Sequence, residues 1–282
     1  MPRPAYLVMP QWQGSPSTRA MQLIEGANAL REDLPSSARH EVSVPLEAGD
    51  GLGTPVARLS SVLRSRDAAT EIIDGIAGPA ISLGGDCAST LAGLQSAVAG
   101  PGADGLAVLW FDAHADLQHP STSPSGAAAG MALRHALGDG VEDLAFDPPV
   151  SPDAVTLVGV RALDAEEDVE LRRLGLRTIE AGERDAASAV RERLAQLGAR
   201  SVYVHIDLDV LDPSEFRSVH TAVPFGLSIA QLTAAVKAAV QAVPLAGAAI
   251  CGFAPGDAEA AADDRPTVLR LLGALTAGQE RT

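Results

Sequence analysis

Aromatic residues and cysteines are scarce in this sequence, and long apolar runs are absent. Aromatic side chains make up 3% of the 282 residues, whereas apolar side chains as a whole make up 46%. The core must therefore be built mainly from Ala, Val, Leu and Ile, and an apolar fraction of this size excludes a disordered chain. No apolar run approaches the roughly 18 residues that a membrane-spanning helix needs, so we expect no membrane association.

The two cysteines, Cys87 and Cys251, are too few for the disulfide framework of a small secreted domain. We therefore expect a cytoplasmic protein, in which a cysteine is of more interest as a ligand or nucleophile than as a cross-link. Basic residues are also outnumbered, since 21 Lys and Arg face 36 Asp and Glu, which gives a formal net charge of −15 at pH 7. That charge disfavours nucleic acid and anionic membranes as partners.

Short runs rich in Val, Ile and Leu alternate with longer Ala-rich stretches of helical period, a pattern typical of repeated βα units. Most of the short runs are continuously apolar, as in a sheet covered on both faces. Strands are expected at residues 6–9, 41–44, 80–83, 106–111, 154–160, 177–179, 202–207 and 248–253. Helices are clearest at residues 185–197 and 229–243. Periodicity does not distinguish a closed (β/α)₈ barrel from an open doubly wound sheet, but both place their sites at the carboxyl ends of strands.

Repeats and low-complexity linkers are missing, so we expect a single domain over residues 1–282. The segment at residues 119–130, HPSTSPSGAAAG, is rich in Pro, Ser and Gly. We expect it to be a loop over a site and not a domain boundary.

One apolar run, in VLWFDAHAD, ends by delivering Asp112, His114 and Asp116 at alternate positions. On an extended backbone all three side chains would point to one side. Two carboxylates and an imidazole form a ligand set suited to Mn²⁺, Zn²⁺ or Fe²⁺. The alternative is a solvated loop start with a helix cap, which needs only one Asp and leaves the other two residues unexplained.

A second run, in VYVHIDLDVLDP, ends in Asp207 and Asp209, again two positions apart. Burying Asp207 between apolar neighbours is costly unless a cation or fixed donors compensate, and a metal ion is the simplest compensation. Asp212 precedes a proline and is better explained as a turn former. His205 alternates in register with Asp207 and is either a neighbour of the metal ligands or a satisfied core histidine.

A third run, in PAISLGGDCAST, ends at two glycines that allow a tight turn and a close approach to a ligand. Asp86 can cap a helix that begins near Ala88, and Cys87 then points into the same crevice. Free cysteine is among the most buried residue types, so composition alone favours the alternative that Cys87 is a small core side chain.

Taken together, GGDCAST, DAHAD and HIDLDVLDP resemble, in this order and at these spacings, the signature of the ureohydrolase family of arginases, agmatinases and formiminoglutamases. The resemblance implies an α/β fold, a single three-layer α/β/α domain with a mostly parallel sheet of about eight strands. It also implies a hydrolase with two Mn²⁺ ions per chain, whose bridging hydroxide attacks the guanidinium carbon and releases urea or a urea-like product. The implied partner is a small guanidino or amidine substrate, and members of the family usually form homo-oligomers.

Carried over to the matching positions, the resemblance assigns metal ligands and substrate contacts. Asp112 and Asp207 are the expected bridging ligands, and Asp116 is also expected to hold the hydroxide and pass its proton to the leaving amine. The expected substrate contacts are Ser125, Thr221 and Gln118. The full expected ligand set is Cys87, Asp112, His114, Asp116, Asp207 and Asp209.

Two departures from the family's pattern lie in the first half of the chain. Cys87 stands where the family usually has a His ligand, and a thiolate suits Zn²⁺ better than Mn²⁺, so this metal position is expected to be weak or altered. Ala129 stands in place of the family's catalytic His, for which His119 is a candidate substitute.

A third departure lies in the last strand, where Gly252 replaces the Glu that normally holds the guanidinium. Asp257 or Glu259 is a candidate to supply that charge from a shifted position. Cys251, just before this glycine, is expected to pack in the core.

Two functions stay open. N-hydroxyarginine hydrolases of the family resemble this chain in having Cys at the first ligand position and in lacking the shuttle His. A hydroxyguanidine is less basic than a guanidine and its leaving nitrogen needs less help, so hydrolysis of a guanidine, hydroxyguanidine or related amidine is our expectation. The alternative is a catalytically degenerate member that binds metal and a small ligand without hydrolysis.

Overall fold

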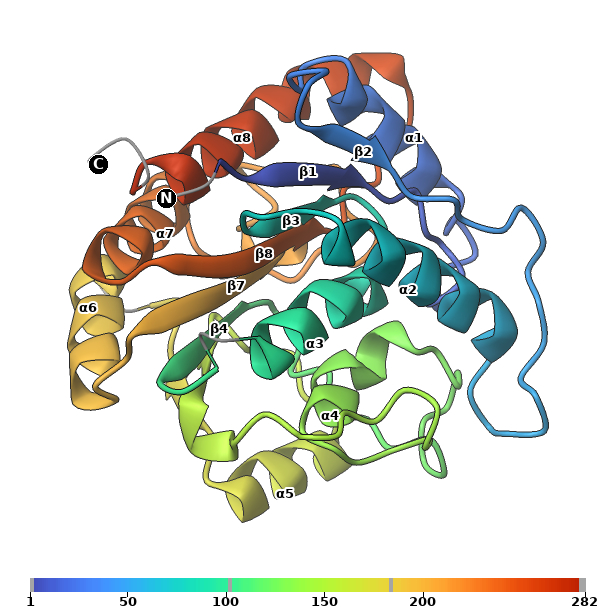
Figure 1. The fold of residues 1–282 in the computed structure, drawn as a ribbon, viewed down its shortest axis with the longest axis horizontal. Helices are drawn as coiled ribbons and strands as arrows, with labels where there is room; N and C mark the ends of the chain where they lie inside the picture. The colour runs from blue at the N-terminus through green and yellow to red at the C-terminus, as the bar shows by residue number, and fades with distance from the viewer. Residues whose placement is uncertain (1–2, 101–102, 183–184, 279–282) are drawn as a thin grey trace.

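A parallel sheet forms the centre of the computed structural model, which describes residues 3–100, 103–182 and 185–278 (Figure 1). Its strands are β1 (Ala5–Val8), β2 (Arg39–Glu41), β3 (Ala80–Leu83), β4 (Leu106–Phe111), β5 (Val155–Val158), β6 (Arg177–Ile179), β7 (Ser201–Asp207) and β8 (Leu245–Cys251). The eight strands lie in the order β2-β1-β3-β8-β7-β4-β5-β6, and every neighbouring pair is parallel. The sheet is therefore open and not a closed barrel.

Helices cover both faces of this sheet and complete three layers (Figure 1). They are α1 (Gln22–Arg31), α2 (Leu59–Asp74), α3 (Leu91–Ala99), α4 (Ala132–Ala136), α5 (Ala165–Leu174), α6 (Ala186–Gln196), α7 (Ile229–Ala242) and α8 (Ala258–Thr276). Helices α1, α6, α7 and α8 bury their apolar side chains in one core, and α2, α3, α4 and α5 pack on the opposite face. This is the arginase-like α/β/α architecture that the family resemblance implied.

The central strands are buried on both faces, which explains their continuous apolar runs. Every residue of β7 is buried, as is every residue of β3 and β5, whereas the edge strands β2 and β6 are partly exposed. Parallel strands need crossover connections, and helices supply them here.

Some strand boundaries differ from the predicted ones, each for a local reason. The expected strand at 41–44 is displaced, because the ladder pairs Arg39–Glu41 with β1 while Val42 packs into the core after the strand has ended. The strands expected at 154–160 and 248–253 end early, at β5 and β8. The next residues, Gly159 and Gly252, have φ angles of 88° and 80°, and this left-handed backbone ends an extended strand.

The predicted helices at 185–197 and 229–243 are confirmed as α6 and α7, and both begin at side-chain caps. Asp185 accepts a hydrogen bond from the backbone nitrogen of Ser188 at the start of α6. Ser228 and Gln231 form a reciprocal capping box at the start of α7, which satisfies backbone groups that the first turn leaves unpaired.

Strand order decides which loops meet. Because β3, β8, β7 and β4 are consecutive in the sheet, their carboxyl ends lie side by side at one edge. The polar residues that follow β3, β4 and β7 in the sequence are therefore brought together, although more than 120 residues separate the first from the last.

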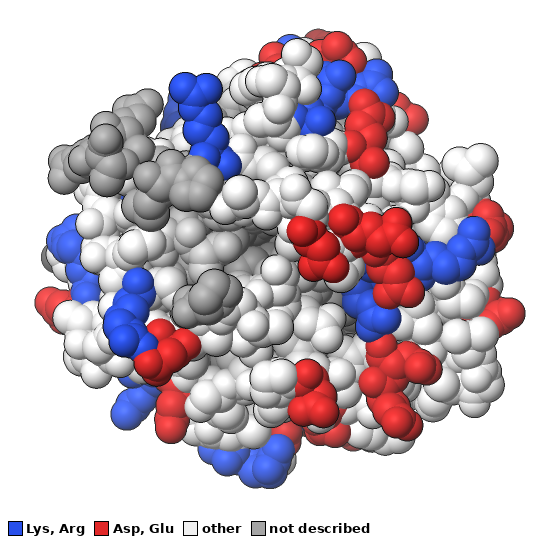
Figure 2. All heavy atoms as spheres, in the orientation of Figure 1, with Lys and Arg blue, Asp and Glu red and all other residues white. Residues whose placement is uncertain are grey.

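Charge is dispersed on the face of the molecule that Figure 2 shows, where acidic and basic side chains lie among a larger uncharged surface. Within the described part of the chain, the helices are too short or too polar to cross a membrane.

Candidate metal centre

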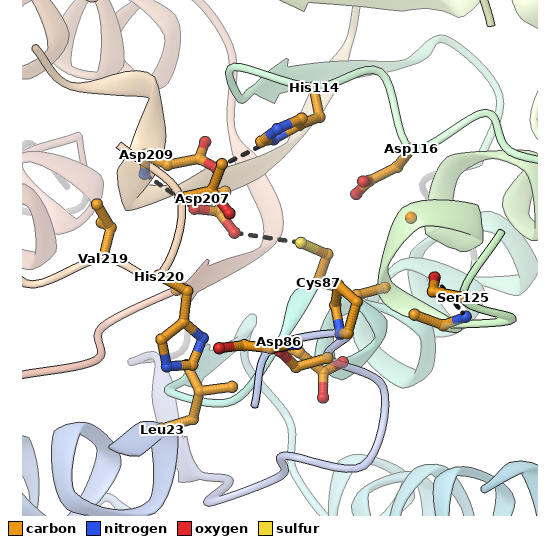
Figure 3. A pocket seen from close by; sticks show the side chains of 18 of the residues that line it. Leu23, Asp86, Cys87, His114, Asp116, Ser125, Asp207, Asp209, Val219 and His220 are labelled. Atoms are coloured by element: carbon orange, nitrogen blue, oxygen red, sulfur yellow. Dashed lines mark hydrogen bonds and ion pairs between the residues drawn. The ribbon is translucent and has the colours of Figure 1, made fainter. Parts of the chain in front are cut away.

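A cavity of about 570 Å³ opens at the carboxyl ends of the central strands (Figure 3). All of the predicted site residues except Asp112 line it. These are Cys87, His114, Asp116, Gln118, Ser125, Asp207, Asp209 and Thr221. Asp112 is buried behind the cavity wall, with its carboxylate within 4.8 Å of ligand atoms of His114 and Asp209. The structure thus brings together the residues that the three motifs singled out.

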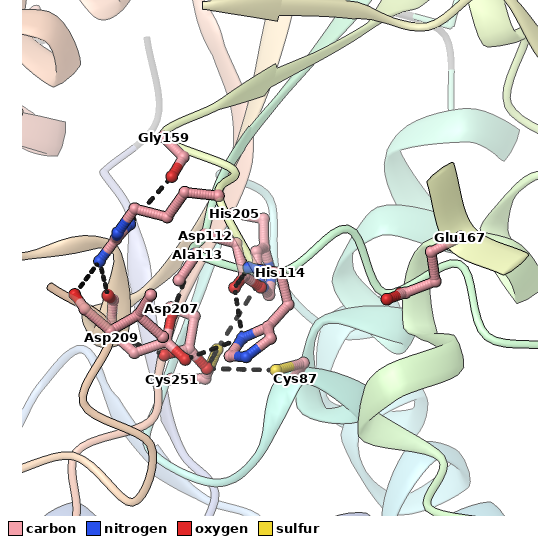
Figure 4. A network of polar contacts seen from close by, with 12 residues as sticks. Cys87, Asp112, Ala113, His114, Gly159, Glu167, His205, Asp207, Asp209 and Cys251 are labelled. Carbon is pink, nitrogen blue, oxygen red and sulfur yellow. Dashed lines mark hydrogen bonds and ion pairs between the residues drawn. The ribbon is translucent and has the colours of Figure 1, made fainter. Parts of the chain in front are cut away.

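Asp112, His114 and Asp209 form one compact ligand group (Figure 4). The Nδ1 atom of His114 lies 3.0 Å from Oδ2 of Asp209 and 3.4 Å from Oδ1 of Asp112. Backbone donors fix the two carboxylates, since the nitrogen of His114 donates to Asp112 and that of Ala113 donates to Asp209. This arrangement offers an imidazole nitrogen and carboxylate oxygens to a shared ion.

A second group joins Cys87, Asp112, Asp116 and His205, whose ligand atoms also lie within 4.8 Å of one another. Asp112 belongs to both groups, as a bridging ligand must. Asp207 lies beside them, because its Oδ2 accepts a hydrogen bond from Sγ of Cys87 at 3.1 Å.

Burial and mutual repulsion dominate the electrostatics of the four carboxylates, which are 1–7% exposed. Burial, together with Asp209 and Asp112, raises the pKa of Asp207 to about 7. Burial and the charge of Asp112 also raise the pKa values of Asp116 and Asp209. Each of these carboxylates thus resists ionisation in the absence of a cation.

His114 and Asp112 show the opposite balance. Burial lowers the pKa of His114, but Asp112 and Asp209 outweigh it and raise that pKa to about 12. Burial raises the pKa of Asp112, but the nearby imidazoles of His114 and His205 outweigh it and hold that pKa below its usual range. The carboxylates therefore stabilise the protonated, positively charged form of His114, and they would stabilise a bound cation in the same way.

Two buried oxygens in this cluster lack a partner. Oδ2 of Asp112 and Oδ2 of Asp116 have no hydrogen bond within the described residues. Unsatisfied buried carboxylate oxygens are costly, and divalent cations bind such oxygens. The residues present therefore fit a divalent metal.

The backbone that carries Asp112, His114 and Asp116 is not extended, contrary to our expectation. β4 ends at Phe111, and Asp116 has a left-handed φ of 52°. The alternating pattern survives because the intervening alanines are fully buried while the turn delivers the polar side chains to the cavity side. Asp is one of the residue types that tolerate this conformation.

Cys87 reaches the cavity through the turn after β3. Asp86 begins a short 3₁₀ helix at Cys87–Thr90, and its buried carboxylate accepts hydrogen bonds from the backbone nitrogens of Ala88 and Gly14. Gln11 donates to the same carboxylate at 3.0 Å. Asp86 thus caps the helix, as predicted, and also ties the loop after β1 to it. Cys87 both lines the cavity and packs against the apolar core of α2, α3 and α4.

The predicted loop over the site is confirmed, since Ser125, Ala127 and Ala129 of this segment line the cavity. Ala129 presents only a methyl group. His119 does not replace the missing imidazole, because it is bound to Ser121 through Nδ1 at 2.7 Å and does not line the cavity.

A side chain at position 252 would displace Asp207. A Cβ built on Gly252 would lie 2.4 Å from Oδ1 of Asp207, and the φ of 80° strains any residue with a side chain. The expected substitutes for the missing Glu are wrong as well. Asp257 caps α8 by accepting a hydrogen bond from Ala260, Glu259 follows in the first turn, and neither lines the cavity.

Several functional candidates were missed or misjudged from the sequence. Cys251 is buried in the core, as expected, but its Sγ also lies 3.6 Å from Oδ2 of Asp207, which the sequence did not predict. β7 pairs Asp207 with Cys251 in register, which only the strand order reveals. His220 and Arg19 also line the cavity, and the Nε2 atom of His220 is buried without a partner in the described part of the chain.

Arg161 fastens the loop that carries Asp209. Its guanidinium donates to the backbone carbonyls of Gly159, Asp209 and Val223 at 2.8 to 2.9 Å. One side chain thereby connects the end of β5 to the segment that follows β7.

Comparison with known proteins agrees with this geometry. Residues 17–264 match the arginase family. The N(omega)-hydroxy-L-arginine amidinohydrolase of Streptomyces lavendulae is 32% identical over 268 residues, which cover 92% of this chain and 93% of that relative. The arginase of Bacillus caldovelox is 38% identical over 158 residues, 52% of this chain and 51% of that relative, so the alignment spans about half of the latter's length.

The fold is shared more widely than the sequence. The crystal structure of Entamoeba histolytica arginase in complex with L-ornithine superposes with a TM-score of 0.83 at 22% identity, covering 96% of this chain and 97% of that one. Fold and site together define a protein of the ureohydrolase class. The chain belongs to the arginase family.

The close approach of Gly252 to Asp207 yields a first prediction. Gly252→Ala should destabilise the protein by about 2 kcal/mol through left-handed strain. It should also weaken Mn²⁺ binding, because the added methyl group displaces Asp207. Urea unfolding and calorimetric titration with Mn²⁺ measure the two effects.

Gly256→Ala is the matched control, because a Cβ at Gly256 meets no atom within 4 Å. If Gly252→Ala bound Mn²⁺ like the wild type, the position of Asp207 would not depend on this glycine.

Proposed function

We propose that the protein hydrolyses a carbon–nitrogen bond of a guanidine, hydroxyguanidine or related amidine in a metal-dependent reaction and releases urea or a urea-like product. The observation that carries this proposal is the group of four buried carboxylates with His114 at the base of a cavity of about 570 Å³. The relative that covers nine-tenths of the chain is an N(omega)-hydroxy-L-arginine amidinohydrolase, so we place N-hydroxy-L-arginine first among the candidate substrates.

Two Mn²⁺ ions per chain are the metals expected from the resemblance. Asp112, His114 and Asp209 would hold one ion, and Cys87, Asp112 and Asp116 would hold the other, with Asp207 as the second shared ligand. When bound, the metals would supply a polarised water as the nucleophile. The single domain over residues 1–282, the cytoplasmic location and the homo-oligomer stay predictions.

Asp116 is the proposed proton carrier. Burial and Asp112 raise its pKa, and its Oδ2 has no hydrogen bond among the residues described, so this oxygen is available to accept a proton. In the balanced reaction, water adds to the amidino carbon and gives a proton to Asp116. The bond from that carbon to the leaving nitrogen breaks, and the amine leaves with this proton.

The Glu that is missing at position 252 affects which substrate the site can select. A guanidinium is positively charged and calls for a carboxylate opposite it, and Gly252 cannot supply one. An N-hydroxyguanidine is less basic and is less charged at neutral pH, so it does not need that carboxylate. Gly252 therefore supports a hydroxyguanidine more than a guanidine.

Polar residues at the cavity wall would orient the rest of the substrate. Ser125, Thr221 and Gln118 all line the cavity, as does Arg19. Arg19 is exposed at the rim and is the proposed partner of a substrate carboxylate. The sequence shows no arginine in the loop beside Ser125, because Arg19 comes from the segment before α1.

A second candidate function is binding of metal and ligand without hydrolysis. The observation in its favour is that Ala129 and Gly252 both line the cavity without a catalytic group. Metal retention fits both functions, so turnover separates them.

Turnover is tested on protein reloaded with Mn²⁺. N-hydroxy-L-arginine should release hydroxyurea about 100-fold faster than L-arginine or agmatine releases urea, because these more basic substrates need the absent acid–base side chain. Product formation is followed by chromatography, with metals per chain measured on the same sample. Full metal loading with tight binding of N-hydroxy-L-arginine but no product would contradict hydrolysis and support the second function.

Arg19→Ala tests whether the substrate carries a carboxylate. The KM for N-hydroxy-L-arginine should rise about tenfold with little change in kcat, because a charge-assisted hydrogen bond to the carboxylate is lost. The decarboxylated analogue N-hydroxyagmatine should show no such rise. Arg270→Ala, on the exposed side of α8, serves as the control. Equal KM values for wild type and Arg19→Ala would exclude this contact.

His220→Gln tests the imidazole that sequence reasoning missed. Burial and Arg19 lower the pKa of His220 from its ordinary value, so the ring is neutral at pH 7 and can accept a proton. The variant should lose about 100-fold in kcat while its metal content stays unchanged. In the wild type the rate should fall as the pH drops through this lowered pKa.

The pH profile of the variant should lack that acidic limb. His119→Gln, outside the cavity, is the matched control. A variant with wild-type kcat would show that His220 has no part in proton transfer.

A further inference from the structure

The only two cysteines of the chain meet at the floor of the metal centre. Cys87 comes from the turn after β3, and Cys251 is the last residue of β8 (Figure 4). Their Sγ atoms and a ring nitrogen of His205 all lie within 4.8 Å of one another. Three donors that lie far apart in the sequence thus converge, since Cys87 and Cys251 delimit a stretch of 165 positions, both ends included.

The spacing of these donors matches tetrahedral coordination. Zinc ligands lie about 2.0 to 2.3 Å from the ion, so two of them in tetrahedral geometry are about 3.3 to 3.8 Å apart. Sγ of Cys251 lies 3.8 Å from Nε2 of His205, and the same nitrogen lies 3.7 Å from Oδ2 of Asp112. The first distance, with the two Sγ atoms and the ring nitrogen all within 4.8 Å of one another, allows Cys87, Cys251 and His205 to share one ion with little movement.

His205 is held in place for such a role. Its ring stacks on Trp110 with the centroids 3.7 Å apart, and the side chain is fully buried. Oδ2 of Asp112, which faces Nε2, is also buried and has no hydrogen bond in the described ranges. A buried carboxylate oxygen that meets a ring nitrogen at 3.7 Å, beyond hydrogen-bond distance, is an independent sign that a cation belongs there.

We propose that Cys87, Cys251 and His205 form a thiolate-rich metal site, with Asp112 beside His205, that binds Zn²⁺ or Co²⁺ in preference to Mn²⁺. It adjoins the harder site of Asp112, His114 and Asp209 and takes the place of the second Mn²⁺ expected from the resemblance, so that the centre holds two different metals. The inference deepens the proposed function by naming the metal class of one position, and it stands on the donor geometry alone.

The chemistry of the donors supports this selectivity. Thiolates are soft ligands that favour Zn²⁺ and related ions, whereas Mn²⁺ favours carboxylate oxygens. Cys251 is fully buried and lies 3.6 Å from Asp207 as well as beside His205, a polar setting that an apolar core residue would not need. The thiol of Cys251 therefore strengthens the preference for Zn²⁺ over Mn²⁺ that Cys87 introduces.

Cobalt absorption tests the proposal directly on the full chain. Thiolate ligands give Co²⁺ an intense near-ultraviolet charge-transfer band, and in this chain only Cys87 and Cys251 can produce it. Metal-free wild type titrated with Co²⁺ should show a band of two-thiolate intensity. Cys87→Ser and Cys251→Ser should each retain about half of it, and the double variant should show none.

Zinc competition gives the second readout. Zn²⁺ should abolish the band at concentrations at which Mn²⁺ does not, and Cys251→Ser should lower Zn²⁺ affinity at least about tenfold. Circular dichroism and urea unfolding of the metal-free variants check the fold, and Cys251→Ala replaces the Ser variant if that variant does not fold.

The outcomes separate this inference from the proposed function. A wild-type band of one-thiolate intensity that stays unchanged in Cys251→Ser would overturn the role of Cys251, and absence of any band would overturn the site altogether. Hydrolysis with Mn²⁺ alone would in either case leave the proposed function standing. A two-thiolate band in a protein that turns over none of the candidate substrates would support the site and contradict the proposed function.

Discussion

Repulsion among buried carboxylates is the constraint on which the rest of this structure depends. Asp112, Asp116, Asp207 and Asp209 lie at one sheet edge with 1–7% exposure, and their only close imidazoles are those of His114 and His205 within the described residues. Burial and mutual repulsion raise the pKa values of three of the four. Protonation would relieve the repulsion but would also remove the negative potential. A divalent cation relieves the repulsion and is itself bound by that negative potential.

A site with this much internal repulsion needs supports that do not depend on the metal. Arg161 holds the carbonyls of Gly159 and Asp209, so the loop after β7 is tied to the end of β5. Asp86 ties the loop after β1 to the short helix that presents Cys87. Glu167 accepts a hydrogen bond from the backbone nitrogen of Leu117 and so anchors the loop after Asp116. The scaffold therefore positions the ligands before any ion arrives, which reduces the reorganisation that binding requires.

The sequence predicted the elements well and their spatial order not at all. Continuous apolar runs located β3, β4 and β7, because strands covered on both faces need apolar side chains at every position. Apolar side chains at helical spacing located α6 and α7. Periodicity could not distinguish a barrel from an open sheet, and the family resemblance resolved that question.

The predicted ligands could be found because each follows a strand end in a recognisable motif. Cys251, His220 and Arg19 could not, because each reaches the cavity only through tertiary placement. Cys251 meets Asp207 through the register of β7 and β8, which are joined by a long crossover. The departures at Ala129 and Gly252 could be seen in the sequence. The physical reason for a glycine at position 252, which is its close approach to Asp207, could be seen only in the structure.

The short distance between Gly252 and Asp207 changes how the departures from the family's pattern should be interpreted together. With Gly252 against Asp207, a side chain at this position would displace that carboxylate, and the loss of the Glu looks at first like decay of an active site. A weakly basic substrate removes the need for a carboxylate opposite the guanidinium. Loss of the Glu and loss of the His at position 129 are then both consistent with one change in substrate charge. Independent decay would have no reason to place both cysteines of the chain within 4.8 Å of the same histidine nitrogen.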